Sequence, residues 1–493
     1  MHSAAINTRR VTRWAFFVIL ATIAVVKYSF YAISYSLVQI FVNEMGFDSP
    51  HAVFYSLMLG GSCYIFSMVG GCLGQSLINY HRVVCAGLFA QLVGAGFLLG
   101  LGICIDDQSA NANLKKALFY TFAIFEAICM TLVNAALPVL GAKQVEHKGE
   151  VAIHDFFAWY YFATNVGSCL AEVFRDLYRT SQMTAMEVMS IPMGIMAFLN
   201  IPLFISGRAV LKIPKIEREA LDDLFSCRNK LVLKHIYHVT LVISSVVMTS
   251  YIIFSQCIAT YASELEVLGN TTTSGAFIPP YIGPVANNSA IIIGIPIYLF
   301  IGKHLKKRGR RLPRPLARFA IGQIIAVVGV MCAAVLEYVR FWRIQQGQPP
   351  PDLLWQIPQY FIEGVSEIFV FVSGYEFIYN ESPPGLHGFL MGLFFCSWGL
   401  GSWVSALLAF LMNMKATNNS SAASGDWYPT DLKHGHMGRY FFLLAGIGTL
   451  ACIMLLAFSR KYVYLRDKNL QGEYERILRS ANDSDTIPSD DST

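Results

Sequence analysis

Long apolar stretches recur from one end of the chain to the other, and they limit its possible folds more than any other feature. Only 14% of the residues are charged, whereas a soluble chain carries about 25%. A helix needs about 20 predominantly apolar residues to cross a bilayer. Stretches of this length fall near 14–42, 52–78, 83–105, 117–142, 154–174, 186–206, 239–263, 277–302, 315–338, 355–379, 388–413 and 439–458. We therefore expect an all-α polytopic membrane protein with about twelve spans embedded in a lipid bilayer.

The N-terminus lacks the pattern of a cleavable signal peptide. Arg9, Arg10 and Arg13 lead directly into an apolar run over 14–41, which is too long for the core of a signal peptide. We expect this run to be the first spanning helix.

No pattern in the sequence predicts an enzyme, a metal site or a bound cofactor. No spacing of Ser, His and Asp suggests a nucleophile, and no glycine-rich loop suggests phosphate binding. The eleven cysteines lie mostly inside apolar segments without paired spacing, which is typical of core residues rather than of bridges or ligands. The basic run 303–318 indicates membrane orientation and not nucleic-acid binding.

One long polar segment, 208–238, divides the spans into six plus six. This predicts a cytosolic segment 1–13, a six-helix bundle 14–207, a cytosolic basic linker 208–238, a second bundle 239–460 and a cytosolic tail 461–493. Within the linker, IEREALDDLF has apolar residues at helical spacing. It is either a helix lying on the membrane surface or an ordinary linker.

The basic residues predict that both termini are cytosolic. The loops on that side then contain Arg82, Lys143, Lys148, the 208–238 segment and the run KHLKKRGRRLPRPLAR. The opposite loops GFDSPH and SELEVLGNTTTSG contain no Lys or Arg. Glycosylation is therefore expected at Asn270 and at Asn418 or Asn419, whereas Asn380 should stay unmodified.

Several segments resemble the proton-dependent oligopeptide transporter family of the major facilitator superfamily. GGCLGQSLINYHRVV is similar to the superfamily's loop after the second helix, with Gln75 where Asp is usual. FFAWYYFATNVGS resembles a family signature that places Asn165 inside a span. The segment from WQIPQY through Glu367 to GYEFIY resembles the family's tenth helix, and FYAISYSLVQIFVNEMGF, FIPPYIGPVANNSAIIIGIPIY and DWYPTDLKHGHMGRYFFLLAG resemble its first, eighth and last helices.

The resemblance implies two six-helix bundles and a solute site between them. It makes Glu367 the carboxylate that meets the amino terminus of a peptide. Asn165 and Asn287 would contact the peptide backbone, and the other positions that match the family's cavity are Tyr31, Tyr64 and Lys27. The alternative for each of these residues is an ordinary hydrogen bond between helices.

The chain also departs from the family pattern. The two acids of the family's helix-1 Glu-x-x-Glu-Arg motif correspond to Ile23 and Val26. Other polar positions of the family correspond to Ser34, Asn134 and Leu57. The family's N-terminal set of proton-coupling groups is therefore absent.

Two acids appear where the family has aliphatic residues, namely Glu126 and Glu363. Glu363 precedes Glu367 by one helical turn, so the two carboxylates cannot both ionise easily; Lys27 could neutralise one of them. The new acids are either a rebuilt proton site or the result of drift in a chain that no longer transports. Glu376 lies on the opposite face, which favours a gate or a structural ion pair.

We expect a secondary transporter of small peptides or related zwitterionic solutes, with the proton gradient as a possible energy source. The alternative is a transport-inactive receptor or scaffold with the same fold. The expected location is the plasma membrane or an endolysosomal membrane. Residues 474–477 (YERI) resemble a tyrosine sorting signal for cytosolic adaptors, and the acidic, Ser-rich end of the tail is expected to be disordered.

Overall fold

The computed structural model describes residues 2–34, 37–43, 46–106, 112–178, 185–216, 230–258, 260–264, 267–271, 275–279, 281–310, 312–417 and 436–465. The described residues form helices that are joined by turns and loops, with two isolated β-bridges in the loops. The first half contains α1 (His2–Ser34), α2 (Leu37–Asn43), α3 (Ser49–Ile65), α4 (Ser67–Ser76), α5 (Tyr80–Asp106), α6 (Ala112–Val145), η1 (Glu146–Lys148), α7 (Glu150–Tyr178) and α8 (Ala185–Gly207). The second half contains α10 (Lys230–Ile258), α11 (Thr260–Glu264), α12 (Ile282–Lys307), α13 (Pro315–Gln345), η2 (Leu353–Gln356), α14 (Ile357–Asn380), α15 (His387–Thr417) and α16 (Met437–Ser459).

Every apolar stretch identified in the sequence forms a helix or a pair of consecutive helices. Ten of the described helical segments are long and apolar enough to cross a membrane. The two remaining long helices are α7, with 29 residues, and α14, with 24 residues. Acidic and amide side chains interrupt the apolar sequence of both helices, and such side chains must face the interior of a bundle rather than lipid.

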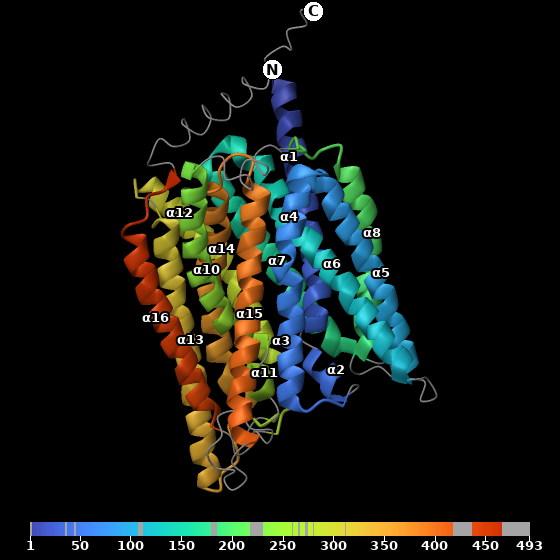
Figure 1. Ribbon diagram of the computed structural model, residues 1–493, viewed down its shortest axis with the longest axis vertical. Helices are drawn as coiled ribbons and strands as arrows, with labels where there is room; N and C mark the ends of the chain where they lie inside the picture. Colours follow the sequence, from blue (N-terminus) through green and yellow to red (C-terminus); the bar gives the residue numbers. More distant parts are fainter. Residues whose placement is uncertain are drawn as a thin grey trace, which may run out of the picture.

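The helices form two bundles, with the first half of the chain on one side and the second half on the other (Figure 1). Helix α15 packs against α3 and α4, and α7 packs against α12 and α14, so these helices join the bundles. We call the end where α1 begins and α16 ends the basic end, because α12 also finishes there with Lys306 and Lys307. The predicted all-α polytopic architecture with two bundles is confirmed.

Glycines allow the bundles to approach closely at the contact of α4 with α15. A Cβ atom on Gly71 would lie 2.0 Å from the backbone oxygen of Gly388, and one on Gly388 would lie 2.4 Å from the oxygen of Gly71. Gln75 of α4 also bonds to the start of α15. Its side-chain oxygen accepts hydrogen bonds from the backbone N–H of Gly388 at 3.0 Å and from that of Phe389 at 3.3 Å. An amide thus caps the start of α15 where the superfamily usually has an acid.

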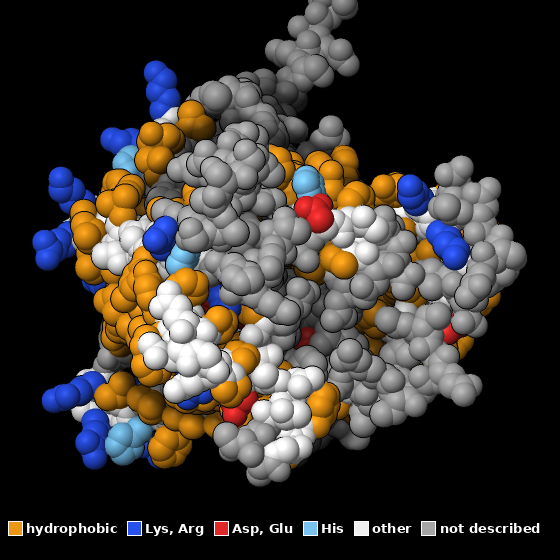
Figure 2. Space-filling model, turned by 90° about the horizontal axis from the view of Figure 1, so that it is seen from below, with side chains coloured by type: hydrophobic (Ala, Val, Ile, Leu, Met, Phe, Trp, Pro, Cys, Tyr) orange, Lys and Arg blue, Asp and Glu red, His pale blue; other side chains and the backbone are white. Residues whose placement is uncertain are grey.

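Helix α10 begins at Lys230, so helical structure reaches into the segment expected to be a linker. Residues 217–229, including most of IEREALDDLF, lie outside the described residues. Helix α13 is 31 residues long and extends beyond its neighbours at the end opposite the basic end (Figure 1). Figure 2 looks onto this opposite end, where hydrophobic side chains predominate over acidic ones among the described residues.

Candidate functional site

Helix α14 is the most enclosed of the polar helices and carries three acids. Its buried residues lie on all sides of the helix and include Glu363, Glu367 and Glu376. A carboxylate at the centre of a bilayer costs about 2.5–3.5 kcal/mol on insertion scales. The groups that contact each acid therefore indicate what that acid does.

Glu367 is held by neutral donors from both bundles. The Tyr161 hydroxyl, on α7 of the first bundle, donates to Oε2, and the Asn287 side chain, on α12, donates to Oε1 at 2.8 Å. Asn287 also donates to the backbone oxygen of Tyr360 at 3.3 Å, which fixes its orientation. No ion pair to Glu367 occurs among the described residues, so none of them supplies a cation to its carboxylate.

Lys27, on α1, is likewise surrounded by neutral partners. Its ammonium donates to the side-chain oxygen of Asn134 at 3.0 Å and to the Tyr64 hydroxyl at 3.4 Å. It also lies 5.0 Å from the centre of the Tyr64 ring and 5.3 Å from that of Phe30. In the described part of the chain no acid lies within ion-pair distance of Lys27, so the suggestion that it neutralises Glu363 or Glu367 was wrong.

Aromatic side chains of both bundles gather beside Lys27. The Tyr64 ring stacks on Phe395 at 6.0 Å and contacts Trp398 at 5.5 Å, so residues of both bundles meet here. The Phe30 ring lies 5.3 Å from the rings of both Tyr31 and Tyr64. Tyr31 is also close enough to Glu367 for the two side chains to interact electrostatically. Tyr31, Tyr64, Lys27, Asn287 and Glu367 are thus brought into one central region.

Asn165 takes a different position. Its side-chain N–H donates to the backbone oxygen of Tyr161, one turn earlier on α7, at 2.8 Å. The amide therefore supports the helix that carries the Tyr161 hydroxyl. Its direct contact with a solute stays a prediction.

Glu363 and Glu126 are both buried, and each has at least one carboxyl oxygen without a hydrogen-bond partner among the described residues. Oε2 of Glu363 has none among the described residues and lies against Gly329 of α13, where an added Cβ would be 3.2 Å away. Both oxygens of Glu126 also have none, and Glu126 lines a small cavity beside Ser34 and Cys63. Lys27 is the basic group whose charge acts on Glu126.

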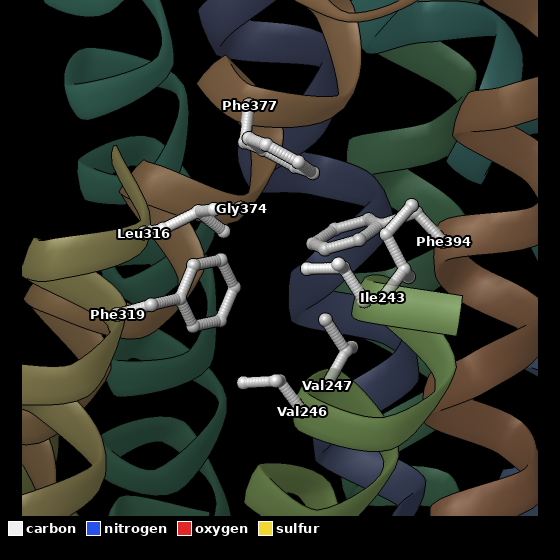
Figure 3. A pocket seen from close by; sticks show the side chains of 9 residues that line it. Ile243, Val246, Val247, Leu316, Phe319, Gly374, Phe377 and Phe394 are labelled. Carbon is white, nitrogen blue, oxygen red and sulfur yellow. The ribbon is translucent and has the colours of Figure 1, made fainter. Parts of the chain in front are cut away.

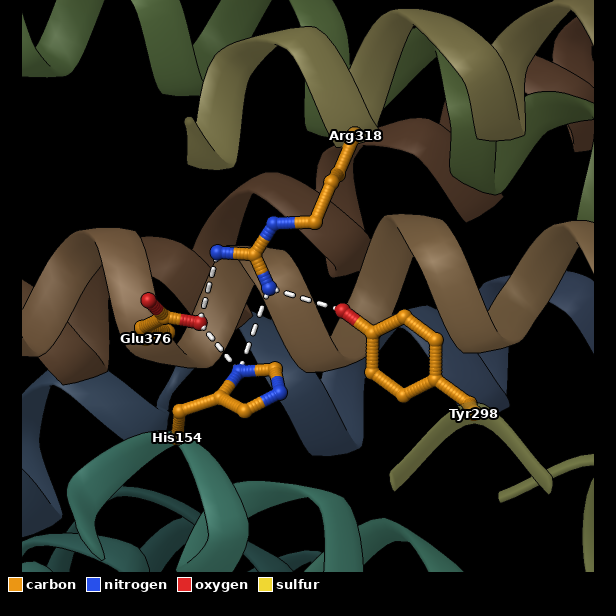
Figure 4. A network of polar contacts seen from close by, with 4 residues as sticks. All are labelled: His154, Tyr298, Arg318 and Glu376. Carbon is orange, nitrogen blue, oxygen red and sulfur yellow. Dashed lines mark hydrogen bonds and ion pairs between the residues drawn. The ribbon is translucent and has the colours of Figure 1, made fainter. Parts of the chain in front are cut away.

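Glu376 belongs to an ion-paired bridge near the basic end (Figure 4). Arg318 of α13 donates to Oε2 of Glu376 at 2.8 Å and to the Tyr298 hydroxyl, on α12, at 2.8 Å. Nδ1 of His154, on α7, lies 2.6 Å from the same carboxylate oxygen and 3.1 Å from Arg318. This bridge joins the first bundle to the second and agrees with the structural ion pair expected for Glu376.

The sequence reasoning missed Tyr161, His154, Tyr298 and the role of Arg318. Arg318 was counted as the last residue of a basic loop, but it is 3% exposed and lies inside α13. Arg318 is the fourth residue of the predicted span 315–338, and this position could have indicated a buried ion pair, because a buried arginine needs an acid nearby. Tyr161 lay within the FFAWYYFATNVGS signature, but nothing in the sequence connects it to Glu367.

Asn270 is exposed and lies between α11 and α12. The preceding Gly269 pairs with Asp352 in the loop after α13, the helix that extends beyond its neighbours at the end opposite the basic end. Asn287 is buried against Glu367, so its sequon is not available for a glycan. Asn418 and Asn419 lie outside the described residues. Glycosylation itself stays a prediction.

The chain is similar to known proteins of the POT family. The model of the POT family (PTR2) matches residues 234–425. Solute carrier family 15 member 3 of Mus musculus is 24% identical, and the alignment covers 92% of each chain. Another relative, protein NRT1/PTR FAMILY 7.1 of Arabidopsis thaliana, is 31% identical over 43% of this chain and 34% of its own length.

Solved structures of POT proteins share the fold. The crystal structure of an auto inhibited POT family peptide transporter has a TM-score of 0.68 at 16% identity, covering 91% of this chain and 97% of that one. A POT family transporter in complex with 5-aminolevulinic acid has a TM-score of 0.64 at 12% identity, covering 90% and 96%. At these identities the likeness shows a shared fold, which is that of the solved POT proteins.

Proposed function

We propose that this protein carries small peptides or related zwitterionic solutes across a membrane by alternating access. The observation that supports this most directly is that two buried ionisable groups, Glu367 and Lys27, have only neutral hydrogen-bond partners among the described residues. A buried charge is costly unless it meets an opposite charge. The amino group of a zwitterion would pair with Glu367, and its carboxylate would pair with Lys27.

Two contacts hold the bundles together across the centre and at the basic end, and alternating access must break them in turn. One is the hydrogen bond from Tyr161 to Glu367, and the other is the bridge of Arg318 and Glu376 with His154. A ligand amine that binds Glu367 competes with Tyr161 for the same carboxylate. Binding of the solute would therefore loosen a contact between bundles. The basic end would face the cytosol of a cell whose plasma or endolysosomal membrane holds the protein.

The energy source in this proposal is a proton gradient, used through acids other than the family's usual ones. Ile23 and Val26 cannot bind protons. Glu363 and Glu126 are buried and have carboxyl oxygens without described partners, which makes them the candidates for binding a transported proton. No cofactor or metal ion has a part in this mechanism.

Uptake by purified protein in liposomes tests the proposal. Labelled di- and tripeptides are offered with and without an inward proton gradient, and empty liposomes serve as the control. Uptake that saturates, and that unlabelled peptide inhibits, is the expected result. Binding without uptake would instead favour the receptor or scaffold alternative, and a lack of both would contradict the proposed substrate class.

A further inference from the structure

The residues that follow α16 fold back onto the basic end of the second bundle. We call residues 461–465 the strap. The Tyr462 hydroxyl donates to Oε2 of Glu381 at 2.7 Å, and the backbone N–H of Leu465 donates to the same oxygen at 3.0 Å. Glu381 is the residue that caps the end of α14 and is 3% exposed. The strap is therefore attached to the end of the helix that carries Glu367 and Glu376.

Aromatic contacts extend this attachment. The rings of Tyr462 and Tyr464 lie 5.5 and 6.3 Å from the ring of Phe377 on α14. The Arg314 guanidinium, at the start of α13, lies 5.1 Å from the centre of the Tyr464 ring. Burial beside the Glu381 carboxylate raises the pKa of Tyr462, so its hydroxyl remains protonated and able to donate. The strap thus contacts both α13 and α14.

The third helix at this place is α10. Nε2 of its His235 lies 3.0 Å from the backbone oxygen of Glu381 and 3.8 Å from the side-chain oxygen. Leu465 of the strap packs against Val232 of the same helix. Glu381 is consequently the point at which α10, α14 and the strap meet.

On its other side Phe377 borders a small apolar cavity (Figure 3). Side chains of α10, α13 and α15 line this cavity, among them Val246, Phe319 and Phe394. The end of α14 is therefore less closely packed on the inner side than on the strap side. Contacts with the strap hold Phe377 where packing against the interior is incomplete.

We propose that Glu381 is a positioning residue, through which the strap keeps the end of α14 in the closed arrangement. Glu376 lies five residues earlier on the same helix, so the position of Glu381 sets the distance of Glu376 from Arg318 and His154. Detachment of the strap frees the end of α14 and favours opening at the basic end. This role rests on the proposed alternating access, but its test needs no substrate.

Two truncations separate the strap from the rest of the tail. One chain ends after Arg460 and lacks the strap, and its control ends after Leu465 and keeps the strap. Both carry Val246→Cys, which places a thiol in the cavity of Figure 3 where Val246 is 3% exposed. The readout is the rate of reaction with a water-soluble maleimide in lipid nanodiscs, corrected for the same chain without that substitution.

The chain without the strap should react at least about tenfold faster than the control, because it loses two hydrogen bonds to the Glu381 carboxylate and the loss of one such bond already accounts for a ratio of about ten. The control should react at the full-length rate. Equal rates for the two truncations would overturn the proposal. This outcome leaves the proposed transport function untouched, because peptide uptake is measured separately.

Substitutions at Glu381 give a second, independent test. Glu381→Ala removes the acceptor for Tyr462 and Leu465 and should accelerate labelling, whereas Glu381→Gln keeps an acceptor oxygen and should restore the slow rate. The Tyr462→Phe variant should be labelled faster than the full-length chain. Its matched control, Tyr237→Phe on an exposed face of α10, should be labelled at the full-length rate. A merely structural role would lower the melting temperature of Glu381→Ala without changing its labelling rate, and that result would contradict the inference.

Discussion

The three acids of α14 show that the partner of a buried carboxylate, and not its position on a helix, determines its role. Glu376 has an arginine, Glu367 has neutral donors from both bundles, and Glu363 has an oxygen with no partner among the described residues. A paired carboxylate stabilises structure, one that meets only neutral donors suits a cationic ligand, and an unpaired one suits a proton. These assignments lead to two predictions.

Replacing Glu367 by Gln should abolish peptide binding and uptake. The amide keeps the shape of the side chain but cannot balance a ligand amine, and losing one partner of a buried charge pair costs about 2–5 kcal/mol. We expect affinity to fall by at least about 30-fold, measured by peptide-induced thermal stabilisation and by uptake. Glu146→Gln, at an exposed acid near the basic end, is the control. Uptake by Glu367→Gln at the wild-type rate would show that Glu367 does not bind the substrate.

Replacing Glu363 by Gln should separate exchange from accumulation. The amide fills the same space against Gly329 but takes up no proton. Exchange of labelled for unlabelled peptide without a gradient should therefore persist, whereas accumulation driven by a pH gradient should be lost. Both are measured in liposomes. Accumulation that persists in Glu363→Gln would make Glu126 the remaining candidate, and a wild-type protein without any pH-gradient dependence would be a uniporter or not a transporter.

Between whole helices, the bundles are held together by two different kinds of contact. At α4 and α15, glycines let backbones approach so closely that a methyl group would collide with a carbonyl oxygen. Between α7, α13 and α14 the contact is the bridge in which Arg318 and His154 both meet Glu376. At both kinds of contact, we expect a small change of one side chain to lower the stability of the protein strongly.

Gly71→Ala should destabilise the contact of α4 with α15. The new methyl group would lie 2.0 Å from the oxygen of Gly388, and overpacking of this type costs about 1–3 kcal/mol. We expect a lower melting temperature and less monodisperse protein in detergent. Gly60→Ala, in the neighbouring helix α3 where a Cβ meets nothing within 4 Å, is the matched control and should be neutral. Equal stability of the two variants would argue against a tight helix contact at Gly71.

Arg318→Gln should weaken the bridge at the basic end. It leaves Glu376 buried without its cation, and breaking a buried pair in this way costs about 3–5 kcal/mol. The double variant Arg318→Gln with Glu376→Gln removes both charges and should recover most of the lost melting temperature. Additive losses in the double variant would mean that the two residues do not act as a pair.

For the molecule as a whole, the distribution of basic residues sets the orientation in the membrane. Asn270 follows Gly269, which pairs with Asp352 just before α14 begins, whereas Asn380 is the last residue of α14, so the two lie near opposite ends of this helix. We predict that Asn270 carries a glycan and that Asn380 does not. Single Asn→Gln variants expressed in animal cells and treated with glycosidase test this by gel mobility. A mobility shift lost only in the Asn380 variant would reverse the topology.

The sequence by itself determined the membrane class, the helices and the division into two bundles. A spanning helix depends on the apolar length of one continuous segment, which is a local property, and each expected stretch forms a helix. The motif in α14 also indicated which acids matter. Helix ends were less accurate, as at α10 and α13, because polar residues continue a helix beyond the apolar segment.

Only the tertiary structure decided which groups meet. Tyr161 and Glu367 are 206 residues apart, and His154 and Glu376 are 222 residues apart. Each contact depends on the rotation of two helices about their axes and on the docking of the two bundles, and neither is encoded in the hydrophobicity of a single segment. For the same reason the sequence placed Arg318 in a loop and Lys27 beside the wrong acids. The packing of helices that are distant in sequence determines which groups surround each buried acid. Those groups decide whether the acid forms a structural bridge, as Glu376 does, or belongs to a candidate solute site, as Glu367 does.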